Sequence, residues 1–150
     1  MTMTTKTSDA AARARRLRED HGRFSREFDD IYDRARTGDW HELDEAWRAF
    51  TEHLEAHLAF EEKEVFPGLR EQGPTFHALV QRLTAQHDEI RQTLLTLGLQ
   101  IQLKEIRASS VEAFIDLMRK HATLEDARVY PWVAREAPAD PASPRSERHA

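Results

Sequence analysis

Two stretches decide the fold: AHLAFEEKEVFPGLR at residues 56–70 and KHATLEDARVYPWVAR at residues 120–135. Both contain the pattern His-x-x-x-Glu-acidic-x-x-Val-aromatic-Pro, and His57 and His121 stand 64 positions apart (121 − 57 = 64), as do Glu61 and Glu125. A repeat at a fixed offset indicates that one structural unit is used twice. A His and a Glu four residues apart share one face of a helix, so both can reach one metal ion.

The composition favours a single helical domain. The chain has 150 residues, 39% hydrophobic and 33% charged, with 5 Gly and 6 Pro. Such a length buries one ordinary core, and this balance favours helix over strand, which predicts an all-α fold. The net charge of −5 argues against nucleic-acid binding. The chain has no cysteine, which excludes disulfides, thiolate catalysis and Cys-ligated metals, so any metal must be held by nitrogen and oxygen.

The two ends differ from the middle in composition. The start lacks the apolar core of a signal peptide, and no apolar run is long enough to span a bilayer, so we expect a cytoplasmic protein without membrane contact. Residues 1–8 and 137–150 are polar, and the second range holds three of the six prolines, which predicts disorder. Residues 9–136 should form the folded domain.

Between these ends, apolar residues recur with a helical period in four segments. Ser8, Asp39 with Glu42, and Ser109 with Glu112 mark expected helix starts, while Pro67 and Pro131 mark expected stops. Four amphipathic helices with short connections predict an up-down-up-down four-helix bundle.

Each helix carries a histidine in its inward stripe. His21 and His87 lie on the first and third segments, at nearly the same offset as the repeated motifs (87 − 21 = 66). Each half therefore reads as a helix with one inward His followed by a helix with inward His-x-x-x-Glu, which predicts a duplicated helical hairpin. Six side chains should then meet in one layer of the core: His21, His57, Glu61, His87, His121 and Glu125.

The energetics favour a metal site in this layer. A buried carboxylate must take up a proton, pair with a cation or bind a metal, and no Lys or Arg falls in these inward positions. A lone inward His is more often a hydrogen-bonded core residue, but four at duplicated positions argue for ligands. Four imidazoles and two carboxylates suit two ions such as iron(II), manganese(II) or zinc(II), with positions left for a small ligand.

Three points stay open at this stage. His53, one turn before His57, is either an extra ligand or a surface residue, and Asp126 could replace Glu125 as the inward acid. The aromatic residues, among them Phe24, should form the core and in part line the metal pocket. Phe66 and Tyr130 should pack the bundle ends, with redox participation by Tyr130 a minor alternative.

The motifs H57-x-x-x-E61-E62-x-x-V-F-P and H121-x-x-x-E125-D126-x-x-V-Y-P, with His21 and H87-D-E-I-R, resemble the hemerythrin-like cation-binding (HHE) domains over about residues 10–135. The resemblance implies a four-helix bundle around two iron ions, bridged by carboxylates and by an oxo or hydroxo group, with Mn or Zn as substitutes. Its implied terminal ligands are His21, His57, His87 and His121, and its implied bridges are Glu61 and Glu125.

The chain departs from the oxygen-carrying members of that family, which have His-x-x-x-His on the third helix. Here the position four before His87 is Leu83. The resemblance implies binding of dioxygen, nitric oxide or peroxide for sensing, storage or redox and stress response. Two alternatives are a di-iron oxidase or peroxidase and a metal-free helical interaction module. No protein partner is indicated.

Overall fold

The computed structural model describes the backbone of residues 2–135 and the side chains of residues 9–135; the predicted tail at 137–150 lies outside this range. All elements in the described range are helical, which confirms the predicted all-α class. In chain order they are α1 (Thr2–Thr37), α2 (Trp40–Phe60), the π-helical turn η1 (Glu61–Val65), α3 (Phe66–Arg70), α4 (Pro74–Gln102), α5 (Ala108–Arg128) and α6 (Tyr130–Arg135).

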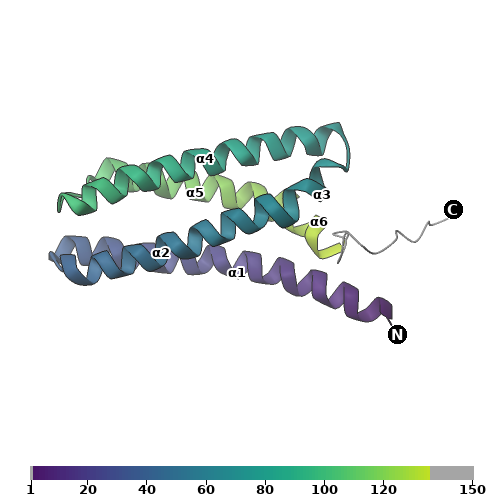
Figure 1. Cartoon of the computed structure of the whole chain (residues 1–150), viewed down its shortest axis with the longest axis horizontal. Coiled ribbons are helices and arrows are strands. Elements are labelled where there is room, and N and C mark those ends of the chain that lie inside the picture. Colours follow the sequence, from purple (N-terminus) through teal and green to yellow (C-terminus); the bar gives the residue numbers. More distant parts are fainter. Residues whose placement is uncertain (1, 136–150) are drawn as a thin grey trace.

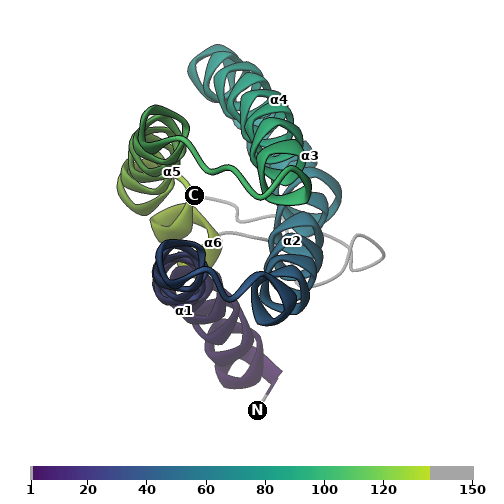
Figure 2. The same cartoon turned by 90° about the vertical axis from the view of Figure 1, so that its left-hand side faces the viewer.

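The long helices α1, α2, α4 and α5 surround a common core, and the short helices α3 and α6 lie toward one end of the bundle (Figure 1). Seen end-on, α1 lies beside α2, α2 beside α4, and α4 beside α5, while α6 packs against α1 (Figure 2). No helix in residues 2–135 combines the length and the apolar character needed to cross a bilayer.

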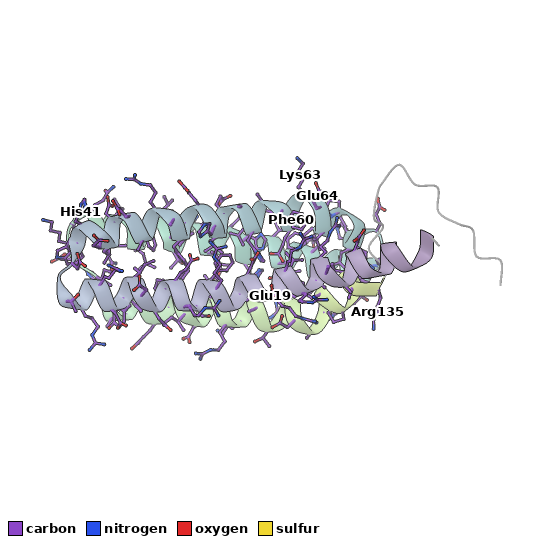
Figure 3. All side chains as sticks on the ribbon, turned by 90° about the horizontal axis from the view of Figure 1, so that it is seen from below. Glu19, His41, Phe60, Lys63, Glu64 and Arg135 are labelled. Carbon is purple, nitrogen blue, oxygen red and sulfur yellow. The ribbon has the colours of Figure 1, made fainter. Side chains whose placement is uncertain are left out.

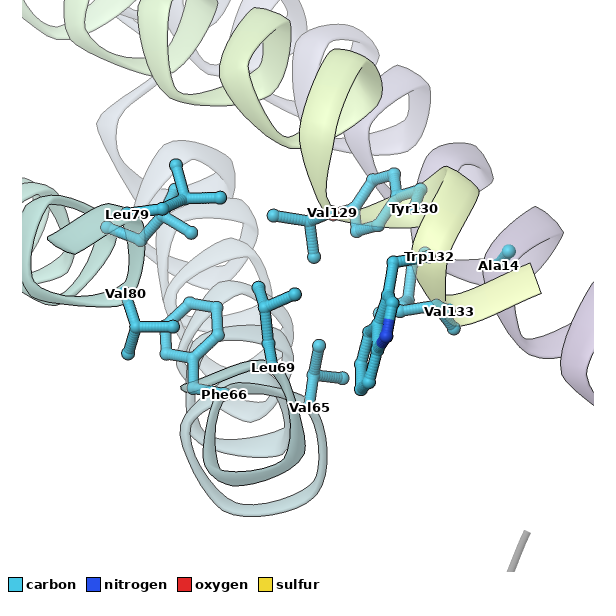
Figure 4. Packing of buried hydrophobic residues seen from close by; sticks show 12 residues of the cluster. Ala14, Val65, Phe66, Leu69, Leu79, Val80, Val129, Tyr130, Trp132 and Val133 are labelled. Atoms are coloured by element: carbon cyan, nitrogen blue, oxygen red, sulfur yellow. The ribbon is translucent and has the colours of Figure 1, made fainter. Parts of the chain in front are cut away.

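Buried apolar side chains form two clusters. One surrounds α3 and α6 and includes Leu69, Val80 and Tyr130 (Figure 4). The other fills the rest of the bundle and includes Phe24 and Phe50. Fully burying one such side chain contributes roughly 1.5–3 kcal/mol, so the two clusters can offset the cost of a buried polar layer.

The polar layer lies between the two clusters on the long helices. On α1, Leu17 belongs to one cluster and Phe24 to the other, and His21 lies between them. On α4, His87 falls in the same way between the two clusters. The buried polar or charged residues of the described chain are His57, Glu61, His87, His121 and Glu125.

Both prolines expected to end helices lie instead near the start of a new short helix. Pro67 belongs to α3 and Pro131 to α6. Helical structure therefore continues past each proline for one more short helix. Proline is tolerated there because the first turn of a helix leaves its N–H groups without intrahelical acceptors. The first restart follows the π-helical turn η1, and the second follows a one-residue interruption of the helix at Val129.

Two helix starts also differ from the sequence expectation. Helix α1 begins at Thr2 and not after Ser8, so it includes most of the residues expected to be disordered; no Gly or Pro interrupts this stretch. Helix α5 begins at Ala108 with Arg107 as its N-cap and no side-chain cap, so the capping box expected from Ser109 does not form. Asp39 does occupy the N-cap of α2, again without a side-chain cap.

Candidate metal centre

The six histidines and glutamates singled out in the sequence all reach one layer of the bundle. Glu61, Glu125 and His87 are 0% exposed, and His57 and His121 are nearly as buried. Only His21, on α1, keeps partial access to solvent, with 13% of its side chain exposed. The four long helices carry five of these side chains, and η1 carries Glu61, so all six lie in the layer that the sequence predicted.

One group of possible metal donors combines Glu61, His87, His121 and Glu125, whose donor atoms all lie within 4.8 Å of one another. The Nε2 atoms of His87 and His121 are 3.1 Å apart. His87 Nε2 lies 3.3 Å from Glu61 Oε1, and His121 Nε2 lies 3.0 Å from Glu125 Oε1. Two imidazoles and two carboxylates thus face a common point.

A second group combines His21, His57 and Glu125. His21 Nε2 is 3.2 Å from Glu125 Oε1, so this carboxylate belongs to both groups. Glu61 Oε1 lies 3.4 Å from His57 Nε2, so Glu61 also contacts imidazoles on both sides. Each carboxylate therefore lies near imidazoles of both groups.

The outer nitrogen of three of the imidazoles is held by a side-chain acceptor. His57 Nδ1 lies 2.8 Å from Asp20 Oδ2, and His87 Nδ1 lies 2.9 Å from Glu62 Oε2. His121 Nδ1 lies 2.7 Å from Gln86 Oε1. In the neutral imidazole, a proton held on Nδ1 by such an acceptor leaves the Nε2 lone pair for a metal, which is the support that metal-binding histidines usually have.

The layer contains buried polar atoms that the protein does not satisfy. Among the described residues, His21 Nδ1, Glu61 Oε1 and Glu125 Oε2 are buried without a hydrogen-bond partner. The ion-pair contacts of Glu61 and Glu125 in this range are all to imidazoles and none to Lys or Arg. Buried polar groups without partners are costly, so this donor set fits bound cations better than an empty core.

In the absence of a metal, protons on histidine balance the two carboxylates. Burial lowers the pKa of His57, but Asp20 and Glu61 outweigh this effect and raise it to about 10. Burial likewise opposes charge on His121, whose pKa Glu125 and Glu61 raise to about 9. Burial works to raise the pKa of Glu61, but its close contacts with Glu125 and three histidines hold it well below its usual value. Metal ions would displace these imidazolium protons.

The π-helical turn η1 explains how the consecutive residues Glu61 and Glu62 both contact the same centre. Glu61 points into the layer, and Glu62 reaches His87 Nδ1 while pairing with Arg91 at 2.9 Å. Lys63 and Glu64 in the same turn are exposed and lie on the outer side of the bundle (Figure 3). Such π-turns inside helices are frequent at functional sites.

The model of the hemerythrin HHE cation-binding domain matches residues 13–142. The chain belongs to this family. No curated protein and no solved structure matched the chain. Family membership confirms the resemblance seen in the motifs, and together with the buried His and Glu cluster it indicates a metal site.

Tyr130 packs in the apolar cluster around α3 and α6 of this HHE domain, as the sequence predicted. Its hydroxyl oxygen also enters the centre, 3.0 Å from Glu61 Oε2 and 3.1 Å from Glu125 Oε1, which the sequence did not predict. The same oxygen lies 2.8 Å from His21 Nε2. Burial and the two carboxylates raise the pKa of Tyr130, so the phenol is neutral in the metal-free chain. The sequence offered one indication of this role: the second copy of the repeat has Tyr130 where the first copy has Phe66.

The structure also decides two open points. His53 does not join the centre of the HHE domain: its side chain is 40% exposed, and it contacts Glu27 at 3.2 Å. Asp126 does not replace Glu125, because its side chain is 51% exposed and pairs with Arg18 at 3.8 Å. His41 lies at the end of the bundle opposite Arg135, far from the centre (Figure 3).

Leu83 occupies the position where oxygen-carrying hemerythrins have a further histidine. It is fully buried in the cluster around α3 and α6. This position therefore contributes packing to the HHE domain and offers no donor atom.

A cavity of about 440 Å³ lies between α1 and α5 and reaches the centre of the HHE domain. His21 and His121 lie in its wall, and aromatic side chains line it as the sequence suggested. These are Phe24, Phe28, Phe50 and Phe114. Ser25, Asp29 and Arg119 are exposed members of the lining, so a small molecule can approach the centre from solvent.

Proposed function

We propose that this HHE domain is a non-heme di-iron protein that binds dioxygen, nitric oxide or peroxide for sensing, storage or redox and stress response. The observation that carries the proposal is the pair of overlapping donor groups that share Glu125. Two neighbouring cation positions joined by carboxylates suit a two-ion centre. The adjacent cavity supplies a route for a small ligand.

The donor set is compatible with iron, which we propose as the natural metal of this centre. Imidazole and carboxylate donors without thiolate suit iron, manganese and zinc, whereas magnesium and calcium prefer more oxygen. We propose two iron ions, bridged by Glu61, Glu125 and an oxo or hydroxo group, with manganese or zinc as substitutes. His21, His57, His87 and His121 are the proposed terminal ligands. When bound, the ions would supply Lewis-acid and one-electron redox chemistry at the inner end of the cavity.

The repeat supports a duplicated hairpin as the plan of the bundle. The two motifs keep one offset of 64 residues, and their histidines and glutamates enter the same layer. We therefore propose an up-down-up-down arrangement of two related hairpins within residues 9–136. Each hairpin contributes one isolated His and one His-x-x-x-Glu pair to the shared centre.

Metal analysis of purified protein from iron-replete medium tests this proposal. We expect about two iron ions per chain, and replacement of His57 or His121 by Ala should reduce the content to one or none, because each removes a buried donor. His53→Ala is the matched control, since His53 lies one turn from His57 but outside the centre. Metal-free wild-type protein, or full occupancy in both His57→Ala and His121→Ala, would contradict the assignment.

A di-iron oxidase or peroxidase is the second candidate. The cavity of about 440 Å³ is far larger than a diatomic ligand requires, which leaves room for an organic substrate beside His21 and His121. Cycles of reduction, exposure to oxygen and deoxygenation separate the two functions. Recovery of the reduced spectrum on deoxygenation supports reversible binding, whereas rapid oxidation without a stable adduct supports turnover. A metal-free interaction module would show neither behaviour.

A further inference from the structure

The two donor groups of the centre are unequal. The first has four protein donors, from Glu61, His87, His121 and Glu125, whereas the second has three, from His21, His57 and Glu125. His53, the remaining histidine near the centre, lies outside it. The second group therefore has one donor fewer at this spacing, although Glu61 Oε1 also lies 3.4 Å from His57 Nε2.

The hydroxyl oxygen of Tyr130 lies beside all three donors of the second group. It is 2.8 Å from His21 Nε2, 3.5 Å from His57 Nε2 and 3.1 Å from Glu125 Oε1. Donor atoms bonded to one ion at about 2.0–2.2 Å are themselves about 3 Å apart. The Tyr130 oxygen thus has the spacing of a ligand to each of the three donors in the second group.

We propose that Tyr130 is a further protein ligand of the ion held by His21, His57, Glu125 and the bridging Glu61, and that it binds as a phenolate. The proposal rests on the proposed metal centre. Ligation breaks the phenol O–H bond, forms a metal–oxygen bond and releases the proton to solvent, with no change in oxidation state. The positive charge of the ions offsets the two carboxylates that otherwise disfavour a phenolate, since a bound cation dominates the local electrostatics.

The repeat shows that the hydroxyl is not needed for packing. Phe66 holds the position equivalent to Tyr130 (130 − 66 = 64), and its ring centroid lies 5.1 Å from that of His87. The Tyr130 ring lies 5.3 Å from that of His21. Both aromatic rings thus pack beside the isolated histidine of a neighbouring helix. The hydroxyl is an additional group placed among donor atoms, and burying it without such partners would cost stability.

Phenolate ligation has consequences that a hydrogen-bonding role lacks. An anionic oxygen is a hard donor and favours iron(III) over iron(II) in the second position. Iron(III) phenolate complexes absorb visible light by charge transfer from the ring. A neutral phenol that only donates a hydrogen bond to Glu61 or Glu125 gives no such band.

The experiment uses the full chain loaded with iron and oxidised to iron(III), with visible absorption and resonance Raman spectra excited in the visible band. The chain has only two tyrosines, and the other, Tyr32, lies near the end of α1 and stacks with Arg36. We expect tyrosinate ring modes in the wild type and in Tyr32→Phe, and their loss in Tyr130→Phe. Because Phe66 shows that this position of the repeat accepts Phe, Tyr130→Phe should retain its helical circular dichroism and its iron.

Incorporation of ring-deuterated tyrosine provides a second test that needs no substitution at position 130. The tyrosinate Raman modes should shift to lower frequency in the wild type, and by the same amount in Tyr32→Phe. A wild type that holds iron but shows no tyrosinate modes would overturn the Tyr130 assignment and leave the proposed centre intact. The same applies if Tyr130→Phe keeps the modes. A wild type that binds no metal would overturn the proposed centre itself.

Discussion

At the scale of single residues, the centre is held by a balance of opposite charges. Glu61 and Glu125 are fully buried, and the partners that surround them are imidazoles and one phenol. In the metal-free chain, protonated histidines supply the countercharge; in the loaded protein, the ions would supply it. Protons and metal ions therefore compete for the same atoms, and the stability of the two forms should depend on pH in different ways.

This competition predicts that the metal-free protein loses stability as the pH rises from about 6.5 toward 10. The pKa of His57 rises on folding from 6.5 to about 10, and that of His121 rises from 6.5 to about 9. A group whose pKa is raised on folding stabilises the folded state fully below its unfolded pKa and ceases to do so above its folded pKa. Thermal unfolding of chelator-treated protein at a series of pH values measures the effect.

The metal-loaded protein is the control for this titration. Its melting temperature should not fall over the same pH range, because metal binding requires the unprotonated imidazoles that higher pH favours. Metal-free protein whose melting temperature stays level or rises between pH 6.5 and 9 would show that His57 and His121 are not charged in the folded state.

At the scale of elements, the π-helical turn η1 sets the register between the centre and the core. Its additional residue lets Glu61 enter the layer while Glu62 contacts His87. It also brings Val65 and Phe66 into the apolar cluster around α3 and α6. In the second copy of the motif the helix is interrupted at Val129, just before α6, while Val129 N–H still donates to the Glu125 carbonyl four residues back. There Asp126 stays at the surface, and Tyr130 enters the centre.

Deleting Lys63 should abolish metal binding and lower the melting temperature. One residue fewer rotates all that follows by about 100° relative to α2, which turns Val65 and Phe66 away from the core. Lys63→Ala is the matched control, since this exposed side chain can change without altering the register. Iron content and thermal unfolding report on both variants. A deletion variant that keeps its metal would show that η1 is not required for the geometry of the centre.

At the scale of the whole molecule, the bundle leaves its centre open on one side. The cavity between α1 and α5 connects His21 and His121 with solvent, whereas the apolar clusters close the layer above and below. A ligand would therefore enter between these two helices and meet the second donor group, which contains the partly exposed His21.

Filling this cavity should slow ligand entry without removing the metal. Ala122 lines the cavity on α5, and Ala122→Trp should reduce the rate at which azide binds the oxidised iron, while the iron content stays constant. Ala113→Trp is the control, because Ala113 is an exposed alanine of the same helix that does not line the cavity. Stopped-flow absorption measures the rate. Equal rates in both variants would mean that ligands reach the centre by another path.

The sequence by itself determined the helical class, the family and the six converging side chains. Each of these follows from local geometry, because residues three and four apart share a helix face whatever the helix packs against. The repeat added that both halves direct the same residue types inward. Thus His57 and Glu61 could be paired from spacing alone, and the inward stripes brought His21 and His87 to the same layer.

Only the tertiary structure decided the inclusion of Tyr130, the exclusion of His53 and Asp126, the π-turn at Glu61 and the open side between α1 and α5. Tyr130 and His21 are 109 positions apart (130 − 21 = 109), and their contact depends on how the helices carrying them are rotated and offset against each other. No periodicity within one helix carries that information. Packing of whole side-chain layers fixes it, and a shift of one residue in the register exchanges an inward side chain for an outward one.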